Sequence, residues 1–146
     1  MAASNRKMLA GALGGALGSV AMKAMVHVCD PDSFGLSSRT DGKAARAILG
    51  SGLEEKRAQR IGAAIHYVFG IATGAAYAAV TGTYPVFRAG RGAVFGAGLW
   101  LIADELAVSV TRLENPRAAN ARSHSSALAA HMLYGIIVDA CCSKAN

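Results

Sequence analysis

The chain has 146 residues, of which 53% are hydrophobic and only 16% are charged, and its formal net charge is +6. An average soluble domain is less apolar and more charged, so the composition favours a single polytopic membrane domain over residues 1–146. The basic residues flank apolar stretches and form no patch interleaved with aromatic residues, which argues against a nucleic-acid partner and favours the lipid bilayer.

Four apolar segments predict four transmembrane helices, at about residues 8–28, 61–81, 92–111 and 125–142. Each approaches the roughly 20 residues that cross a hydrocarbon core of about 30 Å. The predicted fold class is therefore all-α, a four-helix transmembrane bundle. A soluble four-helix bundle is the alternative, but segment 61–81 is apolar on all sides, whereas a soluble helix has one apolar stripe.

The first segment follows Arg6 and Lys7, so it also begins as a secretory signal does. Lys23 interrupts the region where a cleavage site is expected, and no small-x-small motif ends the segment. We therefore expect a retained first helix, with a cleaved signal as the alternative.

Residues 29–60 are expected to form a long loop, because Asp-Pro, Ser-Ser and Gly-Ser-Gly sequences within them mark turns. Asp41 is a candidate N-cap for a short helix ending at Leu49. Ser51 and Glu54 form a candidate capping box for a second helix, which is expected to continue into the next span. The remaining connections are short, as in an up-and-down bundle.

Small residues recur at every fourth position of each segment, which predicts close helix packing, because hydrophobic burial does not drive helices together in lipid. His66 and His131 are in step with these rows, so both histidines are expected to face neighbouring helices. The predicted packing positions are Gly11, Gly15, Gly70, Gly74, Gly96 and Gly135.

Titratable residues from all four segments fall at a similar depth, on the side of the bundle opposite the termini. An unpaired charge costs at least about 2.5–3.5 kcal/mol inside hydrocarbon, so these groups are expected to pair. Lys23 is expected to neutralise one of two adjacent carboxylates, and the histidines are expected to donate to the other. The predicted polar layer consists of Lys23, His66, Asp104, Glu105, His131 and Tyr134.

This layer has three interpretations, namely structural polar contacts between helices, a proton or ion site, and a metal site. Histidine and carboxylate side chains are common metal ligands. Asp104 and Glu105, however, point about 100° apart on one helix, so only one is expected to reach a shared centre. The sequence therefore predicts no metal and no cofactor, with haem ligation by the two histidines as a further alternative.

A weak internal repeat relates the two halves of the chain. An offset of 81 residues places "GALGGA" on "GAVFGA", and an offset of 65 residues places "HYVFG" on "HMLYG". The halves run in the same sense across the membrane, which predicts two parallel helix-pair repeats.

Four stretches, "GALGGALGSVAMK", "HYVFGIATGAAYA", "GAGLWLIADELAVS" and "SHSSALAAHMLYG", carry a family resemblance. Their order resembles the YagU-like family of bacterial inner-membrane proteins, a domain of unknown function, over most of the chain but not over the long first loop. The resemblance implies a multi-pass inner-membrane protein without an assigned catalytic activity and with a link to acid tolerance. The positions that match family signatures are His66, Gly70, Gly74, Tyr77, Trp100, Asp104, Glu105, His131, Tyr134 and Gly135.

The chain departs from this family pattern after Asp104 and Glu105, where members often carry a proline. Here Ser109 stands in the matching stretch, and the next proline is Pro116. The third helix is therefore expected to run longer, which changes the expected depth of its carboxylates.

The sequence contains no nucleophile elbow, Walker loop, HExxH motif or dinucleotide fingerprint, so we expect no enzyme and no catalytic residues. We expect a structural or interaction protein, as a homo-oligomer or with a membrane partner subunit. The alternative is a proton-linked transporter or channel with a relay of His66, His131 and Asp104 or Glu105, because histidine titrates near neutral pH.

Overall fold

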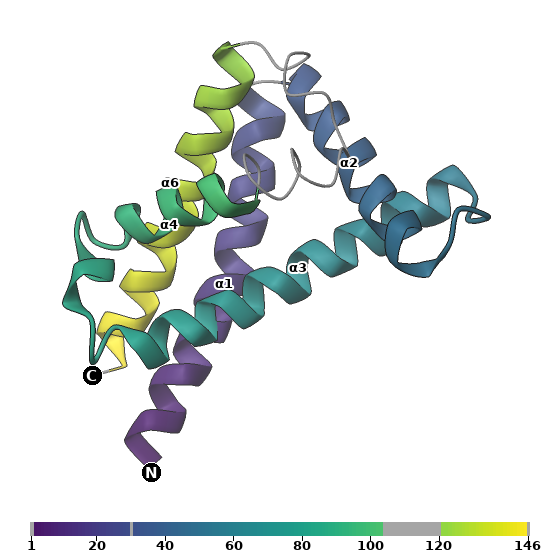
Figure 1. Cartoon of the computed structure of the whole chain (residues 1–146). Helices are drawn as coiled ribbons and strands as arrows, with labels where there is room; N and C mark the ends of the chain where they lie inside the picture. The colour runs from purple at the N-terminus through teal and green to yellow at the C-terminus, as the bar shows by residue number, and fades with distance from the viewer. Residues whose placement is uncertain (1, 30, 104–120, 146) are drawn as a thin grey trace.

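The computed structural model describes residues 2–29, 31–103 and 121–145 (Figure 1). Every element in these ranges is helical, which confirms the predicted all-α class. The elements are α1 (Ala2–Cys29), α2 (Pro31–Leu49), α3 (Glu55–Val80), the short 3-10 helix η1 (Pro85–Arg88), α4 (Ala93–Trp100) and α6 (Ala121–Lys144). The chain continues beyond α4 as a wider π-helical turn to Ala103, and the rest of the predicted third span lies outside the described residues.

Three helices are long and apolar enough to cross a membrane, over Ser4–Cys29, Glu55–Val80 and Ala121–Lys144. The described part of the third predicted span, Ala93–Ala103, is shorter. Leu9, Leu13 and Leu17 form an outward row on α1 and are 58–61% exposed. Water disfavours such a continuous apolar face, whereas lipid accepts it. The chain therefore has the features of a membrane protein, while a bundle of four spans is not established.

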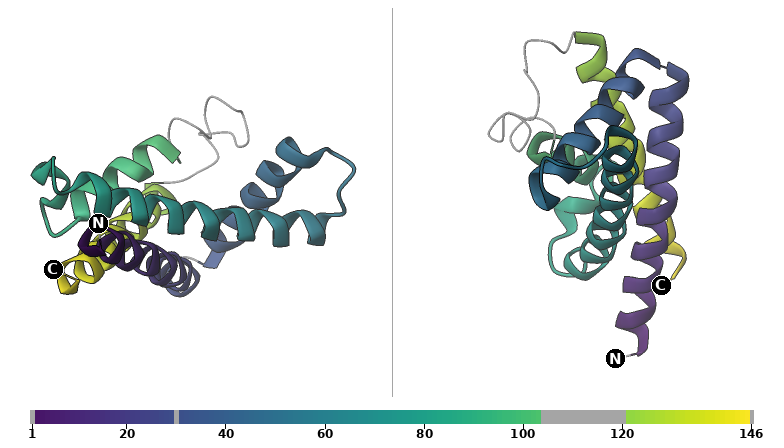
Figure 2. Two further views of the ribbon diagram at one scale, coloured as in Figure 1. Left: turned by 90° about the horizontal axis from the view of Figure 1, so that it is seen from below. Right: turned by 90° about the vertical axis from the view of Figure 1, so that its right-hand side faces the viewer.

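The helices alternate in direction, and both termini lie at the same end of the molecule (Figure 1). α1 and α6 pack side by side in opposite directions, α3 crosses α1 obliquely, and α4 lies across α6. Figure 2 shows the same arrangement from two further sides, with α2 folded back beside the first part of α3. Because α1 contacts both α3 and α6, it is the central helix of the fold.

The α1–α3 crossing depends on glycines at a spacing of four residues. A Cβ atom on Gly15 would overlap the carbonyl oxygen of Gly70, and one on Gly11 would overlap the carbonyl oxygen of Gly74. Ser19 continues the row, and its hydroxyl group donates to the Gly15 carbonyl oxygen at 2.8 Å. The two backbones therefore meet directly, as small residues allow in membrane helices.

The α4–α6 crossing has the same pattern. Gly92 meets the backbone of Gly135, and Gly96 meets the backbone of His131, so the contacts again step by four residues in opposite directions. The two crossings thus share one pattern of close backbone contacts. Relative to the sequence match that places His66 on His131, the residues of α6 that contact α4 are displaced by one helical turn.

The expected long loop over residues 29–60 is mostly helical, because α2 fills most of it. Asp41 lies inside α2 and does not cap it, and α3 has Glu54 at its N-cap position without a side-chain capping bond. Tertiary contacts explain the difference, since Gly62 of α3 lies directly against the backbone of Asp41. As expected, α3 continues without a break from the connection into the second apolar segment.

Candidate intramembrane polar site

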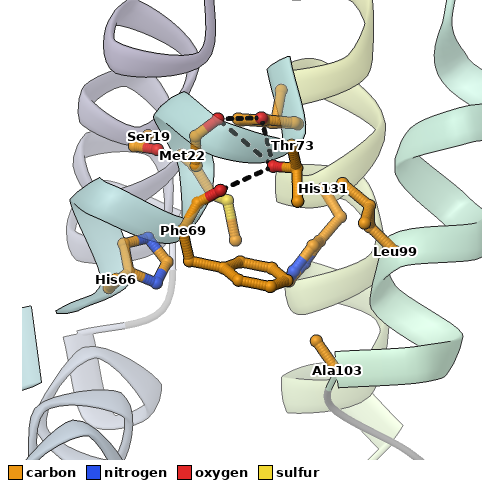
Figure 3. A pocket seen from close by; sticks show the side chains of 10 residues that line it. Ser19, Met22, His66, Phe69, Thr73, Leu99, Ala103 and His131 are labelled. Carbon is orange, nitrogen blue, oxygen red and sulfur yellow. Dashed lines mark hydrogen bonds between the residues drawn. The ribbon is translucent and has the colours of Figure 1, made fainter. Parts of the chain in front are cut away.

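A pocket between α1, α3, α4 and α6 brings together three residues of the predicted polar layer, His66, His131 and Tyr134 (Figure 3). Its volume of ≈ 30 Å³ is enough for about two water molecules. The remaining lining residues are mainly small or apolar, so the two imidazoles are its main titratable groups. The remaining lining residues are Ser19, Met22, Phe69, Gly70, Thr73, Leu99 and Ala103.

Tyr134 links α6 to α3 at this pocket. Its hydroxyl group donates to the Gly70 carbonyl oxygen and lies 2.8 Å from Thr73 Oγ1. Its ring packs on Gly18 of α1, where a Cβ atom would lie 2.7 Å from Tyr134 Cδ2. Tyr134 belongs to the predicted polar layer, and a backbone carbonyl group of α3 receives its hydrogen bond. Its position thus connects three helices.

His131 is oriented by its own helix. Nδ1 lies 2.9 Å from the carbonyl oxygen of Ala127, one turn earlier in α6. A carbonyl oxygen only accepts hydrogen bonds, so Nδ1 carries the hydrogen in this contact. The neutral imidazole then has Nε2 as its acceptor atom. The side chain is buried where α6 meets Gly96 of α4.

His66 differs from His131 because its Nε2 atom is buried and has no hydrogen-bond partner among the described residues. The ring makes an edge contact with Tyr67, with 5.9 Å between the ring centroids. It also interacts electrostatically with Lys23, Asp41 and His131. Buried polar atoms are nearly always paired with protein or water, so the unpaired Nε2 atom of His66 is an exception among the described residues.

Lys23 has a partner that was not predicted, because its Nζ lies 2.6 Å from Asp41 Oδ2, and both side chains are 16% exposed. Because α2 is helical and folds back beside α3, it carries Asp41 to the end of α1. Asp41 was therefore missed as a site residue. Asp104 and Glu105, the two predicted partners, lie outside the described residues.

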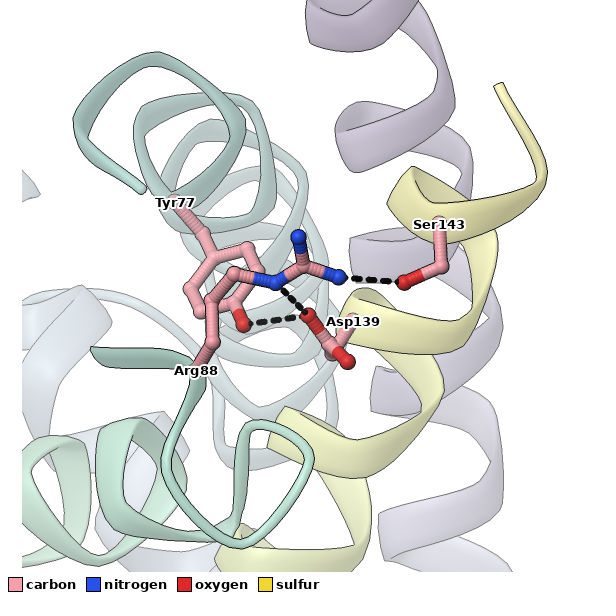
Figure 4. Close-up of polar contacts among 4 residues, drawn as sticks. All are labelled: Tyr77, Arg88, Asp139 and Ser143. Carbon is pink, nitrogen blue, oxygen red and sulfur yellow. Dashed lines mark hydrogen bonds and ion pairs between the residues drawn. The ribbon is translucent and has the colours of Figure 1, made fainter. Parts of the chain in front are cut away.

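A second polar cluster, which we call the Asp139 cluster, consists of Tyr77, Arg88, Asp139 and Ser143 (Figure 4). Asp139 Oδ1 accepts from Tyr77 Oη at 2.7 Å and from Arg88 Nε at 2.9 Å. Arg88 Nη2 also donates to Ser143 Oγ at 2.6 Å. The hydrogen bond to Asp139 and the negative charge of the Asp139 carboxylate raise the pKa of Arg88 above its usual value.

The Asp139 cluster was not predicted, although the sequence contained one signal for it. Asp139 and Arg88 both belong to the side of the molecule that carries the termini. An acidic residue near the end of the last apolar segment needs a cation, and the short connection before α4 supplies one. The cluster ties this connection to α3 and α6.

Among the described residues, no group of three or more histidine, cysteine, aspartate or glutamate side chains is arranged to hold a metal ion. The six glycines predicted for packing all lie at helix contacts, with Gly11, Gly15, Gly70 and Gly74 in the first crossing and Gly96 and Gly135 in the second.

Comparison of the chain with protein-family models, with curated proteins and with solved structures finds no match.

Proposed function

We propose that this chain is a multi-pass protein of the bacterial inner membrane, related to the YagU-like family, with a structural or interaction role. The observation that supports this role most directly is the pair of glycine crossings, in which helix backbones meet without intervening side chains. Such contacts favour a rigid arrangement of helices. The proposed assembly is a homo-oligomer or a complex with a membrane partner subunit.

Sedimentation equilibrium of the chain in detergent tests self-assembly. A protein mass of two or more times the 14.9 kDa of one chain supports the homo-oligomer. A monomer at all protein concentrations rules out self-assembly in that detergent and leaves the heteromeric complex. The membrane orientation is tested separately with a reporter fused after Asn146.

A second function, a proton-linked transporter or channel, is favoured by His66. Its buried Nε2 has no partner among the described residues and lies beside a pocket that also contains His131. Histidine is the side chain whose usual pKa is nearest neutrality, so two imidazoles that line one pocket are suited to relay protons. A proton site would also provide a physical basis for the acid tolerance that the family resemblance implies.

Proton flux into liposomes separates the two functions. The transport function predicts a flux above that of protein-free liposomes, and predicts that His66→Gln with His131→Gln abolishes it. Glutamine keeps hydrogen-bonding capacity but does not titrate. Asp139→Asn is the matched control, because it removes a titratable group in the other cluster. Flux at the protein-free level, or equal flux in the folded double variant and the wild type, supports the structural role.

A further inference from the structure

The tip of the α2–α3 hairpin has a defined and stable shape. α2 ends at Leu49, and the chain turns at Gly50, whose φ of +109° suits glycine. Arg46 holds the turn closed, with Nη1 2.8 Å from Glu55 Oε2 and Nε 3.0 Å from the Leu53 carbonyl oxygen. The first turn of α3 is therefore fixed against the last turns of α2.

Three basic residues at the start of α3, which we call the basic face, are exposed and point away from α2. Lys56, Arg57 and Arg60 lie within about 100° of one another around the helix. Ala58 and Gly62, on the opposite side of α3, are buried. None of the three basic side chains has an ion pair or side-chain hydrogen bond with another described residue, whereas Lys23 and Arg46 are both paired.

The location of the basic face specifies its partner. It occupies the first two turns of the helix Glu55–Val80, which is apolar enough to span a membrane. Charged residues that precede a span lie at the level of the lipid head groups. The exposed side chains of Ile48 and Leu49 end α2 at the same tip of the hairpin. A tip that carries both basic and exposed apolar residues is typical of segments that bind the membrane interface.

We propose that the basic face of Lys56, Arg57 and Arg60 binds the phosphate head groups of anionic lipids and so anchors the α2–α3 hairpin to the membrane surface. The N-terminal end of α3 adds a favourable partial positive charge in the same place. The partner is a lipid, because these residues begin a membrane-spanning helix, where head groups surround the chain. An acidic protein would need no such position.

The test uses the full chain in detergent, titrated with phosphatidylglycerol or with zwitterionic phosphatidylcholine. A lipid that binds the folded state raises the melting temperature by mass action. We expect phosphatidylglycerol to raise it at lower concentration than phosphatidylcholine. Each basic residue near a membrane surface contributes about a fivefold factor, so Arg57→Gln with Arg60→Gln should raise the required phosphatidylglycerol concentration roughly 30-fold.

A matched variant keeps the result specific. Arg57→Lys with Arg60→Lys preserves both charges and should keep most of the response. Equal responses to the two lipids, an unchanged response in the Arg57/Arg60 glutamine variant, or an equal loss in the Arg57/Arg60 lysine variant would each overturn the proposal.

Discussion

The Asp139 cluster and the pocket lined by His66 and His131 are two polar regions on the same pair of helices. They differ in how completely their polar side chains are hydrogen-bonded. Asp139 accepts from both Tyr77 and Arg88, and Arg88 has a further acceptor in Ser143. Three helical turns away on α3, the buried Nε2 of His66 has no partner among the described residues. The first region has the properties of a structural lock, whereas the second leaves a buried polar atom unpaired on a residue that lines a pocket.

The two regions also differ in what surrounds them. Tyr77 is completely buried in a core with Tyr134, Val138 and Cys142, so its hydroxyl group has no access to water. The histidines instead border a pocket that is large enough for water. Removing a partner from the Asp139 cluster should therefore cost stability, whereas changing His66 should cost little. The following variants measure this difference, from the largest expected effect to the smallest.

Replacing Gly15 with leucine should have the largest effect, because it separates the two helices that enclose one side of the pocket. A side chain at this position meets the Gly70 carbonyl group, which borders the pocket and accepts from Tyr134. We expect a loss of about 3 kcal/mol or more in the free energy of unfolding, and about 1–3 kcal/mol for Gly15→Ala. Denaturant titration of the purified protein measures both.

Gly98→Ala is the control for that experiment, because a Cβ atom at Gly98 has open space around it. Alanine also favours helix over glycine by about 0.5–1 kcal/mol. Gly98→Ala should therefore be neutral or stabilising. A Gly15→Ala variant as stable as the wild type would show that α1 and α3 do not meet through their backbones.

Asp139→Leu should have the next largest effect, because it leaves the buried hydroxyl group of Tyr77 without an acceptor. An unsatisfied buried group costs about 1–3 kcal/mol. Arg88 adds little to the loss, since its side chain is 42% exposed and water replaces the carboxylate. Tyr77→Phe should restore part of the stability of Asp139→Leu in a double-mutant cycle. Additive losses would mean that Tyr77 and Asp139 do not interact.

Much of the helical framework follows from the sequence, because the spans depend on runs of apolar residues and the crossings depend on repeated glycines. Both signals are local. The spacing of Gly11 and Gly15, for example, indicates a packing face without indicating which helix covers it. His66, His131 and Tyr134 were grouped by depth in the membrane, and the structure places all three at one pocket.

The partners of the charged residues did not follow from the sequence. Asp41 and Lys23 are brought together by a hairpin in a segment whose turn-forming residues predicted a loop. Arg88 reaches Asp139 of α6 from η1, in the connection between α3 and α4. Such pairings depend on how connections fold in three dimensions, and neither composition nor periodicity records this.

Replacing Lys23 with methionine should have a moderate effect, because its ion pair with Asp41 is partly buried. We expect a loss of about 1 kcal/mol in the free energy of unfolding, and Asp41→Asn in the same chain should restore part of it. The pair Arg46–Glu55 is the control, since those side chains are 31% and 55% exposed and should couple by less than about 0.5 kcal/mol. Equal coupling in both pairs would show that burial does not strengthen the Lys23 pair.

His66→Phe should have the smallest effect on stability, and its sign is the informative result. Because Nε2 of His66 is buried without a partner among the described residues, phenylalanine removes an unsatisfied polar atom and keeps an aromatic ring. We expect the free energy of unfolding to stay unchanged or to rise by up to about 1 kcal/mol. His131→Phe is the matched variant. It loses the hydrogen bond to the Ala127 carbonyl oxygen and should be destabilised by about 1 kcal/mol. A loss at His66 as large as the loss at His131 would mean that His66 also holds a structural partner. The pocket would then resemble the Asp139 cluster, and the observation that favours a relay would be gone.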